Sequence, residues 1–288
     1  MTREDRIKVF HETIDCVKNG FFINKNGDKV SIPTTFDGLS VDNTTYYDED
    51  ITKLIDFDKL PKKETKITVV NMDCIYAAQE LIRLGRNPVV INNASFKRPG
   101  GGVEVGSGAQ EENIFRRSNL FESLYRFSFR LAKDHGLPIE EKQYPLPLRY
   151  GAIYSPNISV FRGGEDVDYA FLDENYVMDF ITIAAIKHPA VIDETYAEIM
   201  KGKIRMMLNL GLHWENDSIV LGAFGCGAYG NPPEFVSSLY KEVLSEDNYK
   251  DKFENVVFAI LDDGNAHREH NPRGNFVPFK EKFEKADA

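Results

Sequence analysis

Residues 98 to 112 read Arg-Pro-Gly-Gly-Gly-Val-Glu-Val-Gly-Ser-Gly-Ala-Gln-Glu-Glu, so seven residues separate a triple glycine from an amide and two adjacent carboxylates. Three glycines without side chains let a ligand lie directly on the backbone, and glycine adopts positive φ without steric cost. After the carboxylates, apolar residues from Ile114 to Phe127 recur at helical spacing, which predicts a helix over about 111–132. Acids at the start of a helix, beside a glycine-lined loop, indicate a candidate catalytic site.

Each half of this pattern also has a plain structural interpretation. Glycine loops are often only turns, and the helix dipole favours Glu in a first helical turn without any function. For either half alone, both interpretations remain open. The combination of the two favours a site.

A second glycine-rich segment runs from Ser218 to Pro233, where an apolar strand leads into glycines at 222, 225, 227 and 230. Pro232 and Pro233 suit the start of a helix, and apolar residues continue at helical spacing behind them. A strand, a glycine loop and a helix N-terminus offer backbone N–H groups and a positive dipole end to phosphate. The alternative is a tight strand-to-helix turn without a ligand. Neither the P-loop pattern nor the dinucleotide-binding glycine pattern is present.

Regular alternation of strands and helices begins at Lys66. The predicted strands are 66–71, 88–92, 152–155, 158–162, 178–184, 218–223 and 255–261. The predicted helices are 73–84, 111–132, 191–211, 232–245 and one at the end of the chain. This alternation argues for an α/β fold with helices on both faces of a sheet. Residues 1–65, which open with a helix from Thr2 to Lys18 that ends at Gly20, are taken as an accessory segment before a main domain at 66–288.

Composition limits the class of protein. The 288 residues suffice for one large core, and the net charge of −10 with interleaved basic and acidic residues argues against binding to duplex nucleic acid. No apolar run is long enough to cross a membrane and the first residues resemble no signal peptide, so we expect a cytoplasmic protein, and a monomer. Three cysteines without metal-ligand spacing suggest neither disulfides nor zinc. Cys226, between two glycines, is interpreted as a small filler, with a reactive thiol as the alternative.

The six histidines are scattered, and none has a spacing to Cys or carboxylate that is typical of a metal site. His267 and His270 could bind a metal, but a solvated loop is the favoured interpretation. We therefore expect no metal and no cofactor.

Taken together, these motifs resemble the macrodomain family, and within it the bacterial-type poly(ADP-ribose) glycohydrolases. The blocks that carry the resemblance are Gly100-Gly101-Gly102, Gln110-Glu111-Glu112, Val89 to Phe96, Tyr154-Ser-Pro156 with Val160-Phe-Arg162, Ile181 to Ala185, Gly222 to Pro232 and the leader from Arg6 to Gly20. They cover nearly the whole chain in the expected order, with departures at Asp73 and Asn93.

The resemblance implies a three-layer α/β/α macrodomain with a mixed central sheet and an N-terminal helical accessory segment. It also implies hydrolysis of ribose–ribose O-glycosidic bonds in poly(ADP-ribose), with ADP-ribose as the product. ADP-ribosylated proteins are the other expected substrates. Glu112 matches the family's general acid, and the neighbouring charges of Glu111 and of a bound diphosphate favour its protonated form. Adjacent helical residues point in different directions, so a water is the expected nucleophile rather than a second carboxylate.

Further site residues follow from the same resemblance. Glu111 is expected to hold ribose hydroxyls and Gln110 to position the substrate. The predicted substrate-binding residues are Gly100, Gly101, Gly102, Ser95, Asn93, Gly225, Cys226, Gly227, Ala228, Tyr229 and Phe276. Asn92 or Asn93 could instead be a turn residue at the end of a strand, and Tyr229 could only cap its loop. Phe276 is expected to stack on adenine, with a core aromatic as the alternative.

Two other functions remain open at this stage. Many macrodomains only bind ADP-ribose, although two carboxylates near an anionic ligand contribute little to pure recognition. Hydrolysis of a mono-ADP-ribosyl linkage, or deacylation of an acylated ADP-ribose, would use the same glycine loops.

Overall fold

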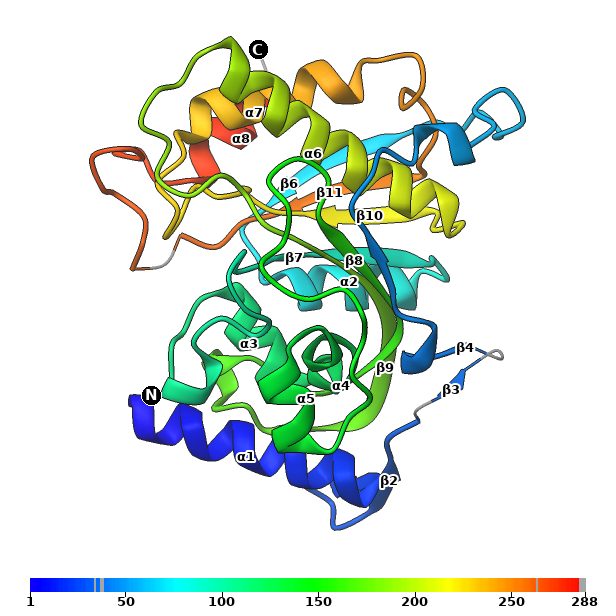
Figure 1. Ribbon diagram of the computed structural model, residues 1–288, viewed down its shortest axis with the longest axis vertical. Coiled ribbons are helices and arrows are strands. Elements are labelled where there is room, and N and C mark those ends of the chain that lie inside the picture. Colours follow the sequence, from blue (N-terminus) through cyan, green and yellow to red (C-terminus); the bar gives the residue numbers. More distant parts are fainter. Residues whose placement is uncertain (34, 37–38, 263, 285–288) are drawn as a thin grey trace. The chain divides into compact units, whose positions relative to one another are not determined.

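The computed structural model describes residues 1–33, 35–36, 39–262 and 264–284 (Figure 1). Its α-helices are α1 (Arg3–Asn19), α2 (Cys74–Arg83), α3 (Gln110–Arg117), α4 (Leu120–Leu124), α5 (Phe129–His135), α6 (Glu194–His213), α7 (Pro233–Leu244) and α8 (Phe276–Phe283). Its strands are β1 (Phe21–Ile23), β2 (Lys29–Ser31), β3 (Thr35–Phe36), β4 (Leu39–Ser40), β5 (Thr45–Tyr47), β6 (Lys66–Val70), β7 (Pro88–Asn93), β8 (Ala152–Arg162), β9 (Phe171–Ile183), β10 (Ser218–Leu221) and β11 (Asn255–Ala259). Short 3-10 turns are η1 (Val41–Asn43), η2 (Thr52–Leu54), η3 (Val103–Val105), η4 (Tyr125–Phe127) and η5 (Glu165–Val167).

The central sheet has seven strands in the order β5-β8-β9-β7-β10-β11-β6, which confirms the expected mixed α/β class. The chain forms two compact units. Unit 1 comprises Met1–Tyr46, Ala94–Leu146 and Ile153–Thr182. Unit 2 comprises Tyr47–Asn93, Pro147–Ala152 and the described residues from Ile183 onward.

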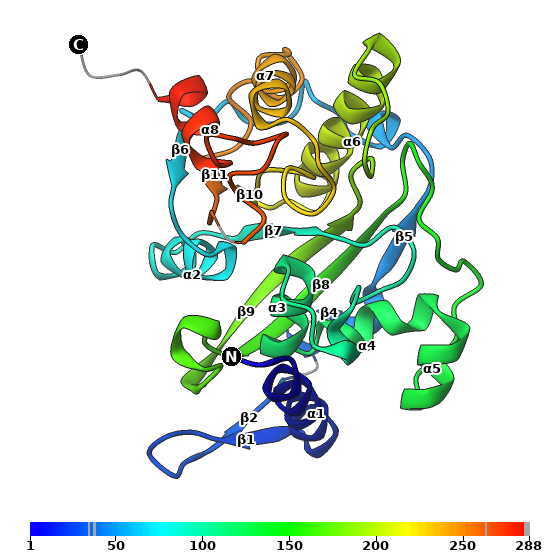
Figure 2. The same ribbon diagram turned by 90° about the vertical axis from the view of Figure 1, so that its left-hand side faces the viewer.

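Unit 2 contains four of the strands that the sequence predicts, and the structure pairs them in parallel. Thr68, Val257, Val220 and Val90 are register partners across β6, β11, β10 and β7. β7 and β10 are buried along almost their whole length, as expected for parallel strands covered on both faces. Figure 2 shows α2 on one face of these strands and α6, α7 and α8 on the other. The helices predicted at 73–84, 191–211 and 232–245 and at the end of the chain are thereby confirmed, with shifted ends.

Unit 1 begins with α1, as predicted. Thr2 and Asp5 form a capping box at its start, and Gly20, at φ 75°, ends it. Phe10 on its inner face is 1% exposed and meets Phe121 edge-to-face at 6.2 Å between ring centroids. The helix is therefore anchored to the core of unit 1.

The single helix predicted over 111–132 is wrong, because the chain divides there into α3, α4, η4 and α5. Ser118 is extended, at φ −147° and ψ 172°, and forms an isolated antiparallel bridge with Val160 of β8. Next to it, Asn119 N–H donates to the Ser159 carbonyl at 3.2 Å. Ser118 and Asn119 thus pair with a strand about forty residues further along the chain and do not continue the helix. The spacing of apolar residues in the sequence does not indicate this pairing.

Two strand boundaries also differ from the prediction. The segments 152–155 and 158–162 form one strand, β8, which continues through Pro156 and through Asn157 at φ 54°. The strand predicted at 178–184 begins earlier, at Phe171. The first half of β9 is mostly half-buried, with Asp173 and Glu174 exposed, and it lacks the continuous apolar run that marks the buried second half.

No helix in the described ranges is both long and apolar enough to span a membrane.

Lys203 of α6 is a buried cation, only 2% exposed. Among the described residues its ammonium has no ion-pair or hydrogen-bond partner, and burial lowers its pKa to about 8. The unfolded chain, with a pKa of about 10.4 for this group, then binds more protons than the folded one between these two values. The free energy of unfolding should therefore rise with pH across that window. Below pH 8 the ammonium is charged in both states, so the folded protein bears the full cost of burying it.

We predict that Lys203→Met raises the free energy of unfolding at pH 7 by up to about 3 kcal/mol and removes its rise between about pH 8 and 10. Urea unfolding at several pH values measures both effects. Lys201→Met is the matched control, because Lys201 is paired with Glu198 at 2.6 Å and is more exposed. A loss of stability in the Lys203 variant at pH 7, with an unchanged pH profile, would contradict the assignment.

Candidate active site

The two carboxylates lie in the first turn of α3, as predicted. Glu111 is 3% exposed and Glu112 is 7% exposed. The helix N-cap, Ala109, offers no side-chain acceptor, so the positive end of the helix is left to the carboxylates. The sequence therefore located the acids correctly, while their burial depends on the loops around them.

Glu111 holds both ends of the loop before the triple glycine. Its Oε2 accepts a hydrogen bond from the Ser95 N–H at 2.7 Å, and its Oε1 accepts one from the Gly100 N–H at 3.0 Å. The segment between Ser95 and Gly100 is thus fixed at two points by one carboxylate. This contact gives Glu111 a loop-holding role that the sequence did not indicate.

Glu112 is held on one side only. Its Oε1 accepts a hydrogen bond from the Gly102 N–H at 2.8 Å. Among the described residues, no donor contacts its Oε2. One oxygen therefore fixes the carboxyl group, while the other can carry or transfer a proton.

The triple glycine is needed for this approach. A Cβ on Gly101 would lie 2.6 Å from Glu112 Oε1 and 3.1 Å from Glu111 Oε2, and the residue has φ +52°. A Cβ on Gly100 would lie 2.7 Å from the Phe115 ring. These glycines permit the close approach of the chain's own carboxylates and of a core aromatic ring. The predicted approach of a ligand to the same glycines stays a prediction.

Asn93 and Ser95, predicted to share a role, contact different elements. Ser95 contacts Glu111 in unit 1, as described above. Asn93 ends β7 in unit 2, where its Nδ2 lies 2.9 Å from the position of a Cβ on Gly222. Asn93 therefore lies at the start of the second glycine loop.

That second loop connects β10 to α7 in unit 2. Backbone N–H groups of Gly225, Gly227 and Ala228 donate to no acceptor among the described residues, so they are available to a ligand. Tyr229 is partly exposed, and Lys187 Nζ lies 5.7 Å from its ring centroid. A turn that only joined two elements would not require three such donors in four residues, so the loop is suited to an anion.

Asn231 holds the loop in shape, and sequence reasoning did not identify it. Its Nδ2 donates to the carbonyls of Ile186 at 2.8 Å and Gly225 at 3.0 Å, and its Oδ1 accepts from Tyr196 Oη at 2.6 Å. The side chain is fully buried. In the sequence, only its position directly before the Pro232-Pro233 pair could have indicated this role.

Cys226 has a structural role in this loop. It is fully buried, and burial raises the pKa of its thiol well above the usual value. Its carbonyl accepts from His270 Nε2 at 2.8 Å and from Asn271 Nδ2 at 3.2 Å. The structure thus favours the filler interpretation over a reactive thiol.

The remaining candidates lie near the C-terminal helix. Phe276, the first residue of α8, is half-buried, and its N–H contacts Asp262 at 3.3 Å, while Phe279 fills the core. His267 and His270 both contact backbone carbonyls. Within the described residues, no three His, Cys, Asp or Glu side chains gather in a way that could hold a metal.

The α/β sheet, the buried carboxylates under a triple glycine and the anion-suited loop before α7 define a protein of the macrodomain class. Residues 11–163, more than half of the chain, match the family model of the microbial-type PARG (poly(ADP-ribose) glycohydrolase) catalytic domain. The chain belongs to this family, which confirms the resemblance drawn from the glycine and Gln-Glu-Glu motifs and makes the protein a glycohydrolase by family.

Solved structures agree with this assignment. The structure is similar to that of poly(ADP-ribose) glycohydrolase from Thermomonospora curvata bound to the inhibitor ADP-HPD, with 26% identity, a TM-score of 0.76, and coverage of 97% of this chain and 100% of that one. A further structure of the T. curvata enzyme has 27% identity, a TM-score of 0.78 and the same coverage. The Deinococcus radiodurans enzyme in complex with ADP-ribose has 25% identity, a TM-score of 0.66, and coverage of 84% of this chain and 94% of that one. Among curated proteins, no sequence matches this chain.

We predict that Asn231→Ala destabilises the protein by about 3 kcal/mol, because it leaves the Tyr196 hydroxyl and several buried carbonyls without partners. Tyr196→Phe, which removes one hydrogen bond, should cost only about 1 kcal/mol. Urea unfolding measures both, and amide hydrogen exchange should report faster opening of Gly225 to Tyr229 in the Asn231 variant. Equal costs for the two variants would contradict a central role for Asn231.

Proposed function

We propose that this protein hydrolyses the ribose–ribose O-glycosidic bonds of poly(ADP-ribose) and releases ADP-ribose, with Glu112 as general acid and a water as nucleophile. Family membership supports the reaction. The observation that supports the role of Glu112 is its one-sided fixation, with Oε1 on the Gly102 N–H at 2.8 Å and Oε2 without a donor from the described residues. No metal or cofactor takes part in the proposed reaction.

The proposed step is protonation of the departing ribose oxygen. As the glycosidic bond breaks, the anomeric carbon acquires oxocarbenium character and the leaving oxygen gains negative charge. A proton from Glu112 Oε2 neutralises that charge, and the carboxylate left behind keeps its hydrogen bond to Gly102. Water then attacks the anomeric carbon and its proton is lost to the solvent or to a phosphate of the substrate.

Glu111 is unsuited to act as the nucleophile. Both its oxygens accept backbone hydrogen bonds, from Ser95 at 2.7 Å and from Gly100 at 3.0 Å. These two hydrogen bonds make both oxygens weaker nucleophiles and hold them against the loop. We propose that Glu111 accepts hydrogen bonds from ribose hydroxyls and that Gln110 positions the substrate.

We further propose that the substrate's diphosphate binds the amide groups of Gly225, Gly227 and Ala228, with the Tyr229 ring against a ribose. Backbone donors at a helix N-terminus bind such a group without cationic side chains, which accords with a net charge of −10. The ribose would contact Gly100 to Gly102 and Ser95, and adenine would stack on Phe276. Asn93 would support the second loop.

The proposed setting is a monomer in the cytoplasm that acts on poly(ADP-ribose) or ADP-ribosylated proteins and does not bind duplex nucleic acid. Residues 1–65 are proposed as an accessory segment of a catalytic domain at 66–288.

We predict that Glu112→Gln lowers kcat for release of ADP-ribose by about 10²- to 10⁴-fold, because the amide supplies no acidic proton. Affinity for ADP-ribose should be almost unchanged. Incubation with poly(ADP-ribose) in EDTA measures release, and calorimetry measures binding. Glu104→Gln is the matched control, since this exposed residue of the same loop faces Arg130 at 3.4 Å. Binding without release by the wild type would instead indicate a reader or an enzyme for mono-ADP-ribosyl linkages.

We also predict that Gly101→Ala lowers kcat at least about tenfold, because the added methyl group displaces the Glu112 carboxyl. Gly136→Ala is the control for backbone strain alone, since Gly136 has φ +68° and no atom within 4 Å of the added carbon. Steady-state kinetics and thermal unfolding of both variants separate the two effects. Full activity in Gly101→Ala would exclude the close packing as a requirement for catalysis.

A further inference from the structure

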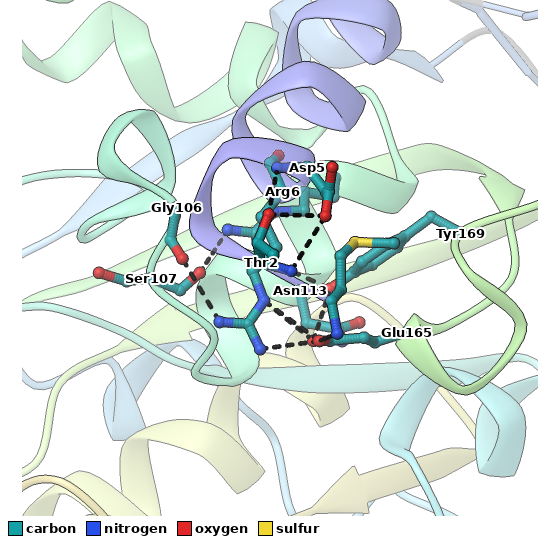
Figure 3. Close-up of polar contacts among 10 residues, drawn as sticks. Thr2, Asp5, Arg6, Gly106, Ser107, Asn113, Glu165 and Tyr169 are labelled. Carbon is teal, nitrogen blue, oxygen red and sulfur yellow. Dashed lines mark hydrogen bonds and ion pairs between the residues drawn. The ribbon is translucent and has the colours of Figure 1, made fainter.

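A polar network links α1 to the loop between the triple glycine and the catalytic carboxylates (Figure 3). Arg6 donates to Glu165 from Nε at 3.1 Å and from Nη2 at 2.7 Å. Its Nη1 donates to the Gly106 carbonyl at 3.4 Å. One guanidinium therefore joins three segments of unit 1 that are far apart in sequence.

Arg116 of α3 completes the network. It is fully buried, donates from Nε to the Arg6 carbonyl at 3.2 Å and donates from Nη2 to the Ser107 carbonyl. Its Nη1 reaches the Tyr169 hydroxyl at 3.5 Å, and that hydroxyl in turn lies 3.5 Å from Glu165. Two arginines thus hold consecutive carbonyls of the same loop.

Gly106 and Gly108 have no side chains, which allows α1 to pack directly against this loop. A Cβ on Gly106 would lie 2.3 Å from the Arg3 carbonyl oxygen, and one on Gly108 would lie 2.8 Å from the centre of the Arg6 guanidinium. Gly106 also has φ +73°. Any side chain at either position would push the helix and the loop apart.

The held loop leads directly to Glu112. Ser107 N–H donates to the Gly102 carbonyl at 3.1 Å, and a Cβ on Gly102 would lie 2.3 Å from Ser107 Oγ. Gly102 N–H donates to Glu112 Oε1 at 2.8 Å. Contacts therefore run without interruption from Arg6 and Arg116, through Ser107 and Gly102, to the proposed acid.

We propose that Arg6, together with Glu165 and Arg116, acts as a positioning residue that fixes the Gly102 N–H and thereby the Glu112 carboxyl. The inference rests on the proposed function of Glu112. Arg6 makes its hydrogen bonds to the loop and not to the reacting atoms, so it acts on the geometry of the acid. Its positive charge also interacts with Glu112 through space. Displacement of a reacting group by about 1 Å can cost 10²-fold in rate.

A positioning role differs from a purely structural one in how the loss of Arg6 affects stability and activity. The side chains of Arg6 and Glu165 are 23% and 27% exposed, so their two-pronged contact is partly buried and only partly screened by solvent. Loss of Arg6 should therefore lower the melting temperature by a few degrees, without unfolding the protein. Loss of a residue that orients an active group, by comparison, typically costs about 10- to 100-fold in activity.

The experiment compares wild type with Arg6→Ala, Arg6→Lys and Glu165→Gln, using release of ADP-ribose from poly(ADP-ribose), calorimetric binding of ADP-ribose and thermal unfolding. We expect Arg6→Ala to lower kcat about 10- to 100-fold with little change in KM or in the ADP-ribose affinity. Arg6→Lys should recover part of kcat, because it keeps the charge but loses the two-pronged contact with Glu165. Glu165→Gln should resemble Arg6→Lys. Lys8→Ala, which removes an exposed charge from the same helix, is the matched control.

The outcomes are distinct. If wild type releases no ADP-ribose, the proposed function fails, whatever the variants do. If wild type is active and Arg6→Ala matches Lys8→Ala, the positioning role is overturned. A parallel fall in kcat, affinity and melting temperature without recovery by lysine also overturns it, since that pattern reports a structural loss. If Arg6→Ala does not fold, Glu165→Gln decides by the same split between kcat and KM.

Discussion

The structure around the candidate site depends on backbone N–H groups that bind two buried carboxylates at the start of α3. Ser95 and Gly100 donate to Glu111, and Gly102 donates to Glu112. Carboxyl groups that are almost fully buried need such donors, because a buried polar group without a hydrogen bond is costly. The same donors fix the loops on both sides of the triple glycine. One set of hydrogen bonds therefore determines both the shape of the loop and the direction in which the acid can act.

Much of the fold could be predicted because its signals are local. The parallel strands of unit 2 are continuous apolar runs, and α1 and α7 carry a capping box and a proline pair at their starts. The division of the predicted helix over 111–132 could not be predicted, since Ser118 leaves the helix to pair with Val160. The start of β9 at Phe171 was missed because polar residues from Asp173 to Asn175 interrupt the apolar residues in the first half of this strand.

The site shows the same limit. The motifs located Glu111, Glu112 and the glycines, because residue type and short spacing carry that chemistry. They could not show that Glu111 holds Ser95 and Gly100, nor that Asn231 organises the second loop. Arg6 and Glu165 are 159 residues apart, so no spacing rule links them. The residues that position a site are thus harder to predict than those that act in it, because their contacts form only in the folded chain.

The central claim is that Glu112 donates a proton to the leaving oxygen, and leaving-group dependence tests it most directly. The measurement compares wild type and Glu112→Gln on poly(ADP-ribose) and on ADP-ribose joined through its anomeric carbon to a nitrophenolate, which departs with little help from an acid. The account predicts a large loss on the polymer and a rate near that of wild type on the nitrophenyl substrate. An equal loss on both substrates would contradict it, because Glu112 would then act on something other than the leaving group.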